Sequence, residues 1–201
     1  MTTPKTVTAP NPADTQYPIH PLLEQRWSPR MFSEEPIAEM HVKQLFEAAR
    51  WAASSYNQQP WRFLYAQKGS EAYDKLIDCL VEFNQQWAKH APLLILTAFE
   101  KQFDNGNDNF HALHDLGLAL GNLSVQAQDM NVALHHMAGF DANKAKEAFN
   151  VPEAFHVTSV IAAGYYGGDP AELSKDLQAG EKRPRVRKPQ EDIAFQDVWP
   201  V

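Results

Sequence analysis

The longest apolar run in the chain, APLLILTAF at residues 91–99, limits the folds that are open to it. The run is far too short to cross a bilayer as a helix, which needs about 20 residues. A short apolar run between polar segments is typical of a buried strand. We therefore expect this segment to be a central strand of a sheet in a soluble domain.

Helical and strand patterns alternate along the rest of the chain. Strand patterns cover residues 61–67, 132–137 and 156–167. Apolar residues recur at helical spacing in five segments, residues 19–25, 33–52, 70–84, 112–130 and 141–149. Ser33 or Pro36 is the expected start of the second helix, Phe83 faces inward in the third, and Asp141 caps the fifth. This interleaving predicts an α/β or α+β fold.

Residues 112–130 form the longest helical candidate. Its inward stripe is expected to comprise Leu113, Leu116, Leu120, Leu123, Ala127 and Met130. A second face carries Gly117 and Gly121, and each glycine weakens a helix by roughly 1 kcal/mol relative to alanine. A helix shared between two subunits would explain them; an ordinary core helix of a monomer is the alternative.

Length and composition restrict the class of protein. The 201 residues suffice for one substantial domain, which we place at residues 18–201, after a flexible arm at 1–17 and with an extended tail from about 181 to 201. The net charge of −7 disfavours binding to nucleic acid or anionic membranes. The single cysteine, Cys79, allows no internal disulfide and favours a reducing compartment. Because no apolar leader is found, we expect a cytoplasmic protein.

Two arginine-rich segments lie at opposite ends of this acidic chain, RWSPR at residues 26–30 and RPRVRKP at 183–189. The planar donor fork of arginine suits phosphate, and alternate residues of an extended segment project to one side. One interpretation is a split phosphate site; from charge alone, two solvated basic tails are favoured. The chain has no glycine-rich phosphate loop, so side chains would have to hold a phosphate-containing cofactor.

The segment SSYNQQPW at residues 54–61 contains hydroxyl, amide and aromatic side chains and no charge. Composition alone indicates a polar turn that follows a helix. Its place among five other segments is more informative. In chain order these are RWSPRMF, LFEAARWAASSYNQQPWRFLYA, FNQQWAKHAPLLIL, HDLGLALGNLSVQAQDM, HHMAGFD and RPRVRKP.

Together the six segments resemble the FMN-dependent nitroreductase family, from residue 18 to the C-terminus. The resemblance implies an α+β fold with a mixed, mainly antiparallel central sheet flanked by helices. It also implies an intertwined homodimer with two FMN sites at the subunit interface.

The resemblance further implies which residues bind FMN. The N-terminal segment, Arg26, Ser28 and Arg30, would contact the phosphate and the ribityl chain, and Arg185 and Arg187 would bind the phosphate. Trp27 would line the mouth of the pocket. Four polar residues would reach the flavin from the partner subunit: Ser54, Ser55, Asn57 and Gln59.

The same resemblance places Asn84 at the pyrimidine edge of the flavin and a backbone N–H of Ala138 or Gly139 opposite flavin N5. It also places Trp87 among the FMN contacts, at a position where relatives often have a basic residue. Because FMN performs the electron transfer itself, we expect no catalytic side chain.

The histidines offer an alternative of another kind. His111 and His114 lie three residues apart, and His135 and His136 are adjacent. A metal site would need a carboxylate at ligand spacing, which is not evident, so we expect none. We expect His111 and His114 to begin a helix near the interface, and one of the later pair to pack beneath the flavin.

The resemblance implies an oxidoreductase that uses NADH or NADPH to reduce a nitroaromatic or quinone-like acceptor by ping-pong hydride transfer. Two alternatives stay open. A flavin enzyme of this fold could instead dehydrogenate or dehalogenate its substrate or consume the flavin, and a non-catalytic protein could store or sense FMN.

Overall fold

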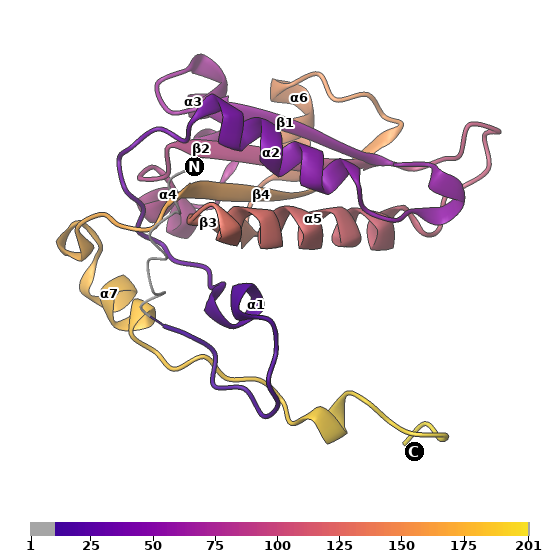
Figure 1. Cartoon of the computed structure of the whole chain (residues 1–201). Helices are drawn as coiled ribbons and strands as arrows, with labels where there is room; N and C mark the ends of the chain where they lie inside the picture. Colours follow the sequence, from indigo (N-terminus) through magenta and orange to yellow (C-terminus); the bar gives the residue numbers. More distant parts are fainter. Residues whose placement is uncertain (1–10, 201) are drawn as a thin grey trace.

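The computed structural model describes residues 11–200 of the chain (Figure 1). Four strands and seven α-helices are found there. The strands are β1 (Trp61–Gln67), β2 (Leu93–Glu100), β3 (Val132–Met137) and β4 (Phe155–Tyr165). The helices are α1 (Pro21–Gln25), α2 (Glu39–Arg50), α3 (Glu71–Cys79), α4 (Glu82–Ala88), α5 (Ala112–Asp129), α6 (Ala142–Ala148) and α7 (Lys175–Glu181). Short 3-10 turns occupy Ser55–Asn57, Pro170–Glu172 and Gln190–Asp192.

The four strands form one sheet in the order β1-β2-β4-β3, and every pairing between them is antiparallel. The apolar run at residues 91–99 supplies β2, which lies inside the sheet as predicted, and its first six residues are buried. The register between β2 and β4 shifts between Thr97 and Ala98. The predicted α+β class, with a mainly antiparallel sheet flanked by helices, is confirmed.

The core consists of two layers, one on each face of the sheet. Successive residues of a strand point to opposite faces, so Leu94 and Leu96 of β2 join one layer and Leu93 and Ile95 join the other. Helices α3, α4 and α6 cover the first face, and α2 and α5 cover the second (Figure 1). Because helices cover both faces of the sheet, β2 is buried on both sides and needs no polar residue along its first half.

The helix predicted at residues 70–84 is wrong in its extent, because it is two helices. Ser70 caps α3, whose last residue is Cys79, and α4 begins at Glu82. Between them Leu80 is extended and forms a bridge with Phe140, and the N–H of Val81 donates to the carbonyl of Gly139. This pairing with a distant segment prevents a continuous helix. The break also turns Phe83 outward, so that 53% of it is exposed.

Two smaller expectations about helices also need correction. Helix α2 begins at Glu39 after Ala38, which makes no side-chain cap, rather than near Ser33 or Pro36. In α5 the predicted stripe is buried at Leu116 and Leu123, but Leu113 is 59% exposed. Gly117 and Gly121 face open space, because a Cβ on either would meet no atom within 4 Å. Nothing in the single chain therefore packs closely against these two glycines.

The beginning of the described chain lies beside α1 and the start of the C-terminal tail, apart from the sheet, and the tail then extends away from both (Figure 1). The first ten residues of the predicted arm are outside the described range. Asn11 donates from Nδ2 to the carbonyl of Arg183, and the N–H of Ala13 donates to the carbonyl of Glu24. These bonds join the beginning of the chain to α1 and to the tail. Among residues 11–200, no helix combines the length and apolarity that a membrane span requires.

Candidate functional site

The two arginine-rich segments meet in the folded chain. Arg185 donates from Nη1 to the carbonyl oxygens of Asn11 and Glu24, at 3.1 and 2.8 Å. Burial lowers the pKa of Arg185, and the positive charges of Arg26 and Arg187 lower that pKa further. Arg26 also donates to Ser28 Oγ at 3.4 Å. The guanidinium groups of Arg26, Arg185 and Arg187, from opposite ends of the chain, are therefore close enough for their charges to repel one another.

This arginine cluster (Arg26, Arg185 and Arg187) has no carboxylate to balance it. Within residues 11–200, no Asp or Glu lies at ion-pair distance from any of the three guanidinium groups. Like charges gathered without a counterion raise the free energy of the folded state, and an anion at their centre relieves that cost. The cluster is therefore suited to a multiply charged oxyanion such as a phosphate.

The end of strand β3 contributes two histidines to the candidate site. The predicted histidine pair lies at its end, and burial lowers the pKa of both His135 and His136 to about 4. The nearby positive charge of Arg26 lowers the pKa of His136 further; neighbouring groups crowd the imidazole although part of the residue reaches solvent. His135 is neutral at pH 7, so its Nδ1 carries a proton and donates to the carbonyl of Pro29 at 2.9 Å.

The free energy of unfolding should decrease as the pH falls from about 6.5, the usual pKa of histidine, to about 4. Over that range the unfolded chain binds protons at His135 and His136, whereas the folded chain does not. Urea unfolding at a series of pH values measures this slope. His135→Asn keeps a donor for Pro29 and should flatten the slope; an unchanged slope would mean that native His135 is already protonated.

The loop after β3 brings three predicted residues together. The carbonyl of Gly139 accepts from the N–H of Val81 at 3.1 Å and from Asn84 Nδ2 at 3.0 Å. A Cβ on Gly139 would lie 2.8 Å from that amide nitrogen, so a larger residue there would displace the side chain of Asn84. Ala138 is exposed beside it. The predicted ring-edge residues Asn84, Ala138 and Gly139 are thus neighbours.

The two predicted tryptophans occupy different environments. Trp87 is fully buried and packs on the ring of His135, with 4.4 Å between ring centroids. It therefore lies beneath the surface rather than on it. Trp27 stacks on Tyr166 at 6.5 Å and lines a cavity of about 630 Å³. Other residues of this cavity include Met31, Gly168, Gln178 and Glu181.

The polar segment after α2 has an unusual backbone. Tyr56, Asn57 and Gln59 have φ angles of 51°, 56° and 51°, in the left-handed region. Such conformations cost about 1–3 kcal/mol each outside glycine and persist only where surrounding contacts hold them. Ser54 Oγ accepts from the N–H of Gln59 at 3.0 Å. Gln59 Nε2 in turn donates to the carbonyl of Asn57 at 2.9 Å.

A buried carboxylate on α5 fixes the same segment. Asp115 is 2% exposed, its Oδ2 accepts from the N–H of Ser55 at 2.9 Å, and its Oδ1 lies 3.2 Å from His114 Nδ1. His111 and His114 line a shallow pocket of about 210 Å³ beside Ser54 and Ser55. Across the described range, no group of three or more His, Cys, Asp or Glu side chains could hold a metal ion.

Asp115→Ala should lower the free energy of unfolding by about 1–3 kcal/mol, because the N–H of Ser55 loses its buried acceptor. Asp115→Asn keeps an acceptor oxygen and should lower it by clearly less. Urea denaturation of both variants measures the difference. Equal losses would show that the charge, rather than the hydrogen bond, holds the segment.

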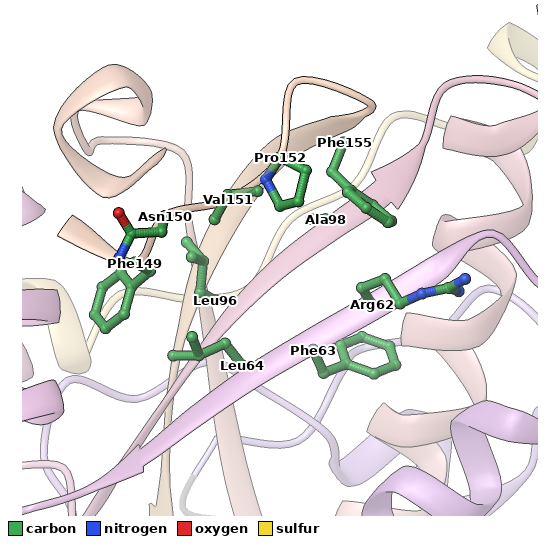
Figure 2. Close-up of a pocket in the computed structure, with 10 residues that line it drawn as sticks. All are labelled: Arg62, Phe63, Leu64, Leu96, Ala98, Phe149, Asn150, Val151, Pro152 and Phe155. Atoms are coloured by element: carbon green, nitrogen blue, oxygen red, sulfur yellow. The ribbon is translucent and has the colours of Figure 1, made fainter. Parts of the chain in front are cut away.

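The single chain does not bring all the predicted residues together. The segment from Ser54 to Gln59 follows α2 at one end of the sheet, whereas α7 and the start of the tail lie beyond the opposite end (Figure 1). Further pockets lie outside the cluster, of which two are close to the sheet or to the polar segment. One, of about 440 Å³, adjoins Tyr56, Phe103 and Asp104. The other, of about 230 Å³, is formed by β1, β2 and the loop before β4 and has a mainly apolar lining (Figure 2).

Sequence reasoning missed two residues that contact the site. Tyr166 stacks on Trp27 and donates to Gln128 Oε1 at 2.8 Å, and Glu181 contacts Arg30. Neither residue belongs to a pattern. A tyrosine at a strand end and a glutamate in a charged tail are common, and only the folded chain shows what they touch.

Comparison with known proteins gives a consistent result. The model of the "Nitroreductase family" matches residues 23–85 and 72–165. A Mycolicibacterium smegmatis protein described as "Uncharacterized 15.4 kDa protein in ask 5'region" is 30% identical over 136 residues, 66% of this chain and 90% of that protein. A Ralstonia nicotianae protein described as "Putative NADH dehydrogenase/NAD(P)H nitroreductase" is 23% identical over 151 residues, 66% of this chain and 77% of that protein.

Solved structures share the fold. The chain is similar to a crystal structure described as an oxidoreductase containing FMN, with a TM-score of 0.88 and 33% identity over 94% of this chain and 96% of the other. A Desulfovibrio desulfuricans nitroreductase solved in complex with FMN has a TM-score of 0.70. Its identity is 22%, over 92% of this chain and all of that one, which supports the fold alone.

Proposed function

Because this chain belongs to the nitroreductase family, we propose that it is an FMN-dependent oxidoreductase that takes electrons from NADH or NADPH. The observation that carries the proposal is the arginine cluster, in which Arg26, Arg185 and Arg187 lie together without a carboxylate. The phosphate of FMN supplies the anion that these residues lack. The relative that contains FMN, at 33% identity, supports the same choice.

The predicted site residues also suit the parts of FMN beyond its phosphate. When bound, FMN would supply the hydride chemistry, which no side chain of this chain has to perform. Arg26, Ser28, Arg185 and Arg187 would hold the phosphate end. Asn84 and the backbone at Ala138 and Gly139 would contact the ring. His135 or His136 would pack beneath the ring, and a neutral imidazole there would add no charge.

The site is proposed to be completed by a second copy of the chain. Ser54, Ser55, Asn57 and Gln59 lie away from the arginine cluster in one chain, so they would reach the flavin of a partner subunit. Strained backbone held by Asp115 is typical of a segment that a ligand requires in one conformation. An exposed face of α5, with Leu113, Gly117 and Gly121, would lie in the interface.

Purified protein tests the cofactor. We expect an oxidised flavin spectrum near neutral pH, either as isolated or after addition of FMN and removal of the excess. A protein that stays colourless after this treatment would contradict the proposal.

Anaerobic mixing of the FMN-loaded protein with NADH or NADPH then tests catalysis. Rapid bleaching, followed by recovery when a nitroaromatic or a quinone is added, supports an oxidoreductase with such an acceptor. A yellow spectrum that neither nucleotide changes would favour the non-catalytic alternative. Bleaching without recovery would favour the alternatives that dehydrogenate or dehalogenate another substrate.

A further inference from the structure

Glu181, the last residue of α7, holds Arg30 at two points. Its Oε2 accepts from the backbone N–H of Arg30 at 3.0 Å, and its Oε1 accepts from Nη1 at 3.3 Å. The side chains are 14% and 27% exposed, so water screens this ion pair less than it would a surface pair. The contact joins residues that are 151 positions apart in the chain.

The position of Glu181 is not explained by its helix alone. A carboxylate at the C-terminal end of a helix opposes the helix dipole, and the last turn of α7 has no basic residue. Leu177, one turn earlier on the same face, is 5% exposed and anchors α7 in the core. Gly180 also faces Arg30, because a Cβ there would lie in ordinary contact with Arg30 Nη1, at 3.6 Å. Helix α7 is therefore docked so that Glu181 reaches Arg30.

Arg30 differs in charge balance from the arginine cluster. It is the member of the predicted phosphate group that has a carboxylate partner, so the net charge near it is small. Its guanidinium carbon also lies 6.0 Å from the ring centre of Trp87. Its Nε is buried and has no hydrogen-bond partner among the described residues, so part of its donor set stays unused.

We propose that Glu181 is a positioning residue for the cofactor site and acts through Arg30. It occupies one edge of the guanidinium and fixes the backbone of the N-terminal segment, so that the remaining donors face an uncharged acceptor of the ligand rather than its phosphate. This inference rests on the proposed function, because the ligand is FMN. The arginine cluster binds the dianion, and the pair of Arg30 and Glu181 orients the uncharged part of the molecule.

The experiment is a double-mutant cycle on the full chain, with FMN binding followed by quenching of FMN fluorescence. Glu181→Ala should weaken binding about three- to tenfold, the usual cost of releasing one long ordered side chain. In an Arg30→Ala background the same change should weaken binding by about twofold or less, because only the backbone contact is then lost. Glu181→Gln, which keeps an acceptor, should lie between wild type and Glu181→Ala.

Two controls make the cycle specific. Asp176→Ala removes the same charge from an exposed position on α7 and should leave FMN binding unchanged. The salt dependence of FMN binding should be the same in Glu181→Ala as in wild type, because the phosphate contacts are intact.

Three outcomes would overturn the inference. Equal effects of Glu181→Ala in both backgrounds would mean that Glu181 only docks α7. Unchanged or tighter FMN binding in Glu181→Ala would mean that Arg30 needs no support. If the wild-type protein binds no FMN at all, the proposed function fails and this inference fails with it. If the wild-type protein binds FMN but Glu181→Ala has no effect, this inference alone fails.

Discussion

Arg187→Ala is expected to raise the dissociation constant of FMN by about 10- to 150-fold, the equivalent of 1.5–3 kcal/mol for one lost charge-assisted hydrogen bond. Of the three arginines in the cluster, Arg187 can be replaced with the least disturbance to the fold. Its side chain is exposed, and among residues 11–200 its one hydrogen bond is to the carbonyl of the preceding residue, Val186, at 2.8 Å. Arg185, by contrast, also ties the tail to Asn11 and Glu24, so its loss would disturb the fold.

A matched control is available four residues earlier. Arg183 is exposed, and in the described part of the chain its guanidinium makes no hydrogen bond or ion pair, so Arg183→Ala removes the same charge without touching the cluster. We expect FMN affinity in that variant to stay within about twofold of wild type, as for a screened surface charge. Titration of apoprotein at two salt concentrations measures both variants. Equal losses in the two would show that the tail attracts FMN only by its overall charge.

Most of the fold could be predicted from the sequence because its main signals are local. The apolar run of β2 and the helical periodicity of α5 depend on side chains within one segment, and both were placed correctly. The division between α3 and α4 was missed because it depends on Leu80, which pairs with Phe140 far along the chain. No pattern within residues 70–84 could have indicated that contact.

The candidate site divides in the same way. Alternation in the two arginine segments pointed to one phosphate site, and the fold brings Arg26 and Arg185 into one electrostatic neighbourhood. Charge alone had favoured two solvated tails, because sequence patterns do not show which distant segments meet. Glu181 went unnoticed for the same reason. Its significance depends on Arg30 and on the way Leu177 docks its helix.

The role of the segment SSYNQQPW in binding FMN stays a prediction, because it depends on a second copy of the chain. The structure explains its local chemistry, because Ser54, Gln59 and Asp115 hold a backbone that would otherwise be unfavourable. A lone polar turn would not need this support. The strain is understandable if the segment must match a ligand. In one chain, the segment lies at one end of the sheet and α7 with the start of the tail lies beyond the other end (Figure 1). The cofactor site and the dimer are therefore one hypothesis.

A chain that ends after Pro189 tests that hypothesis most strongly. It keeps Arg185 and Arg187 but lacks four apolar residues that are exposed in the single chain, three of them by more than 60%: Ile193, Phe195, Val198 and Trp199. Full burial of each such side chain is worth about 1.5–3 kcal/mol. If a second copy covers them, even half of the total would raise the dimer dissociation constant by more than about 100-fold.

The truncated chain should therefore be a monomer at micromolar concentration in sedimentation experiments, whereas the full chain should be a dimer. It should also lose FMN although it keeps the arginine cluster, because the segment around Ser54 would no longer reach the flavin of a partner. Arg187→Ala in the full chain separates the two effects, since it should weaken FMN binding and leave the dimer intact. Full-length Trp199→Ser should weaken the dimer in part.

A truncated chain that is still dimeric and binds FMN normally would show that the tail does not cross to a partner. A truncated monomer that binds FMN normally would show that one chain holds the whole site, and Ser54, Ser55, Asn57 and Gln59 would then need another role.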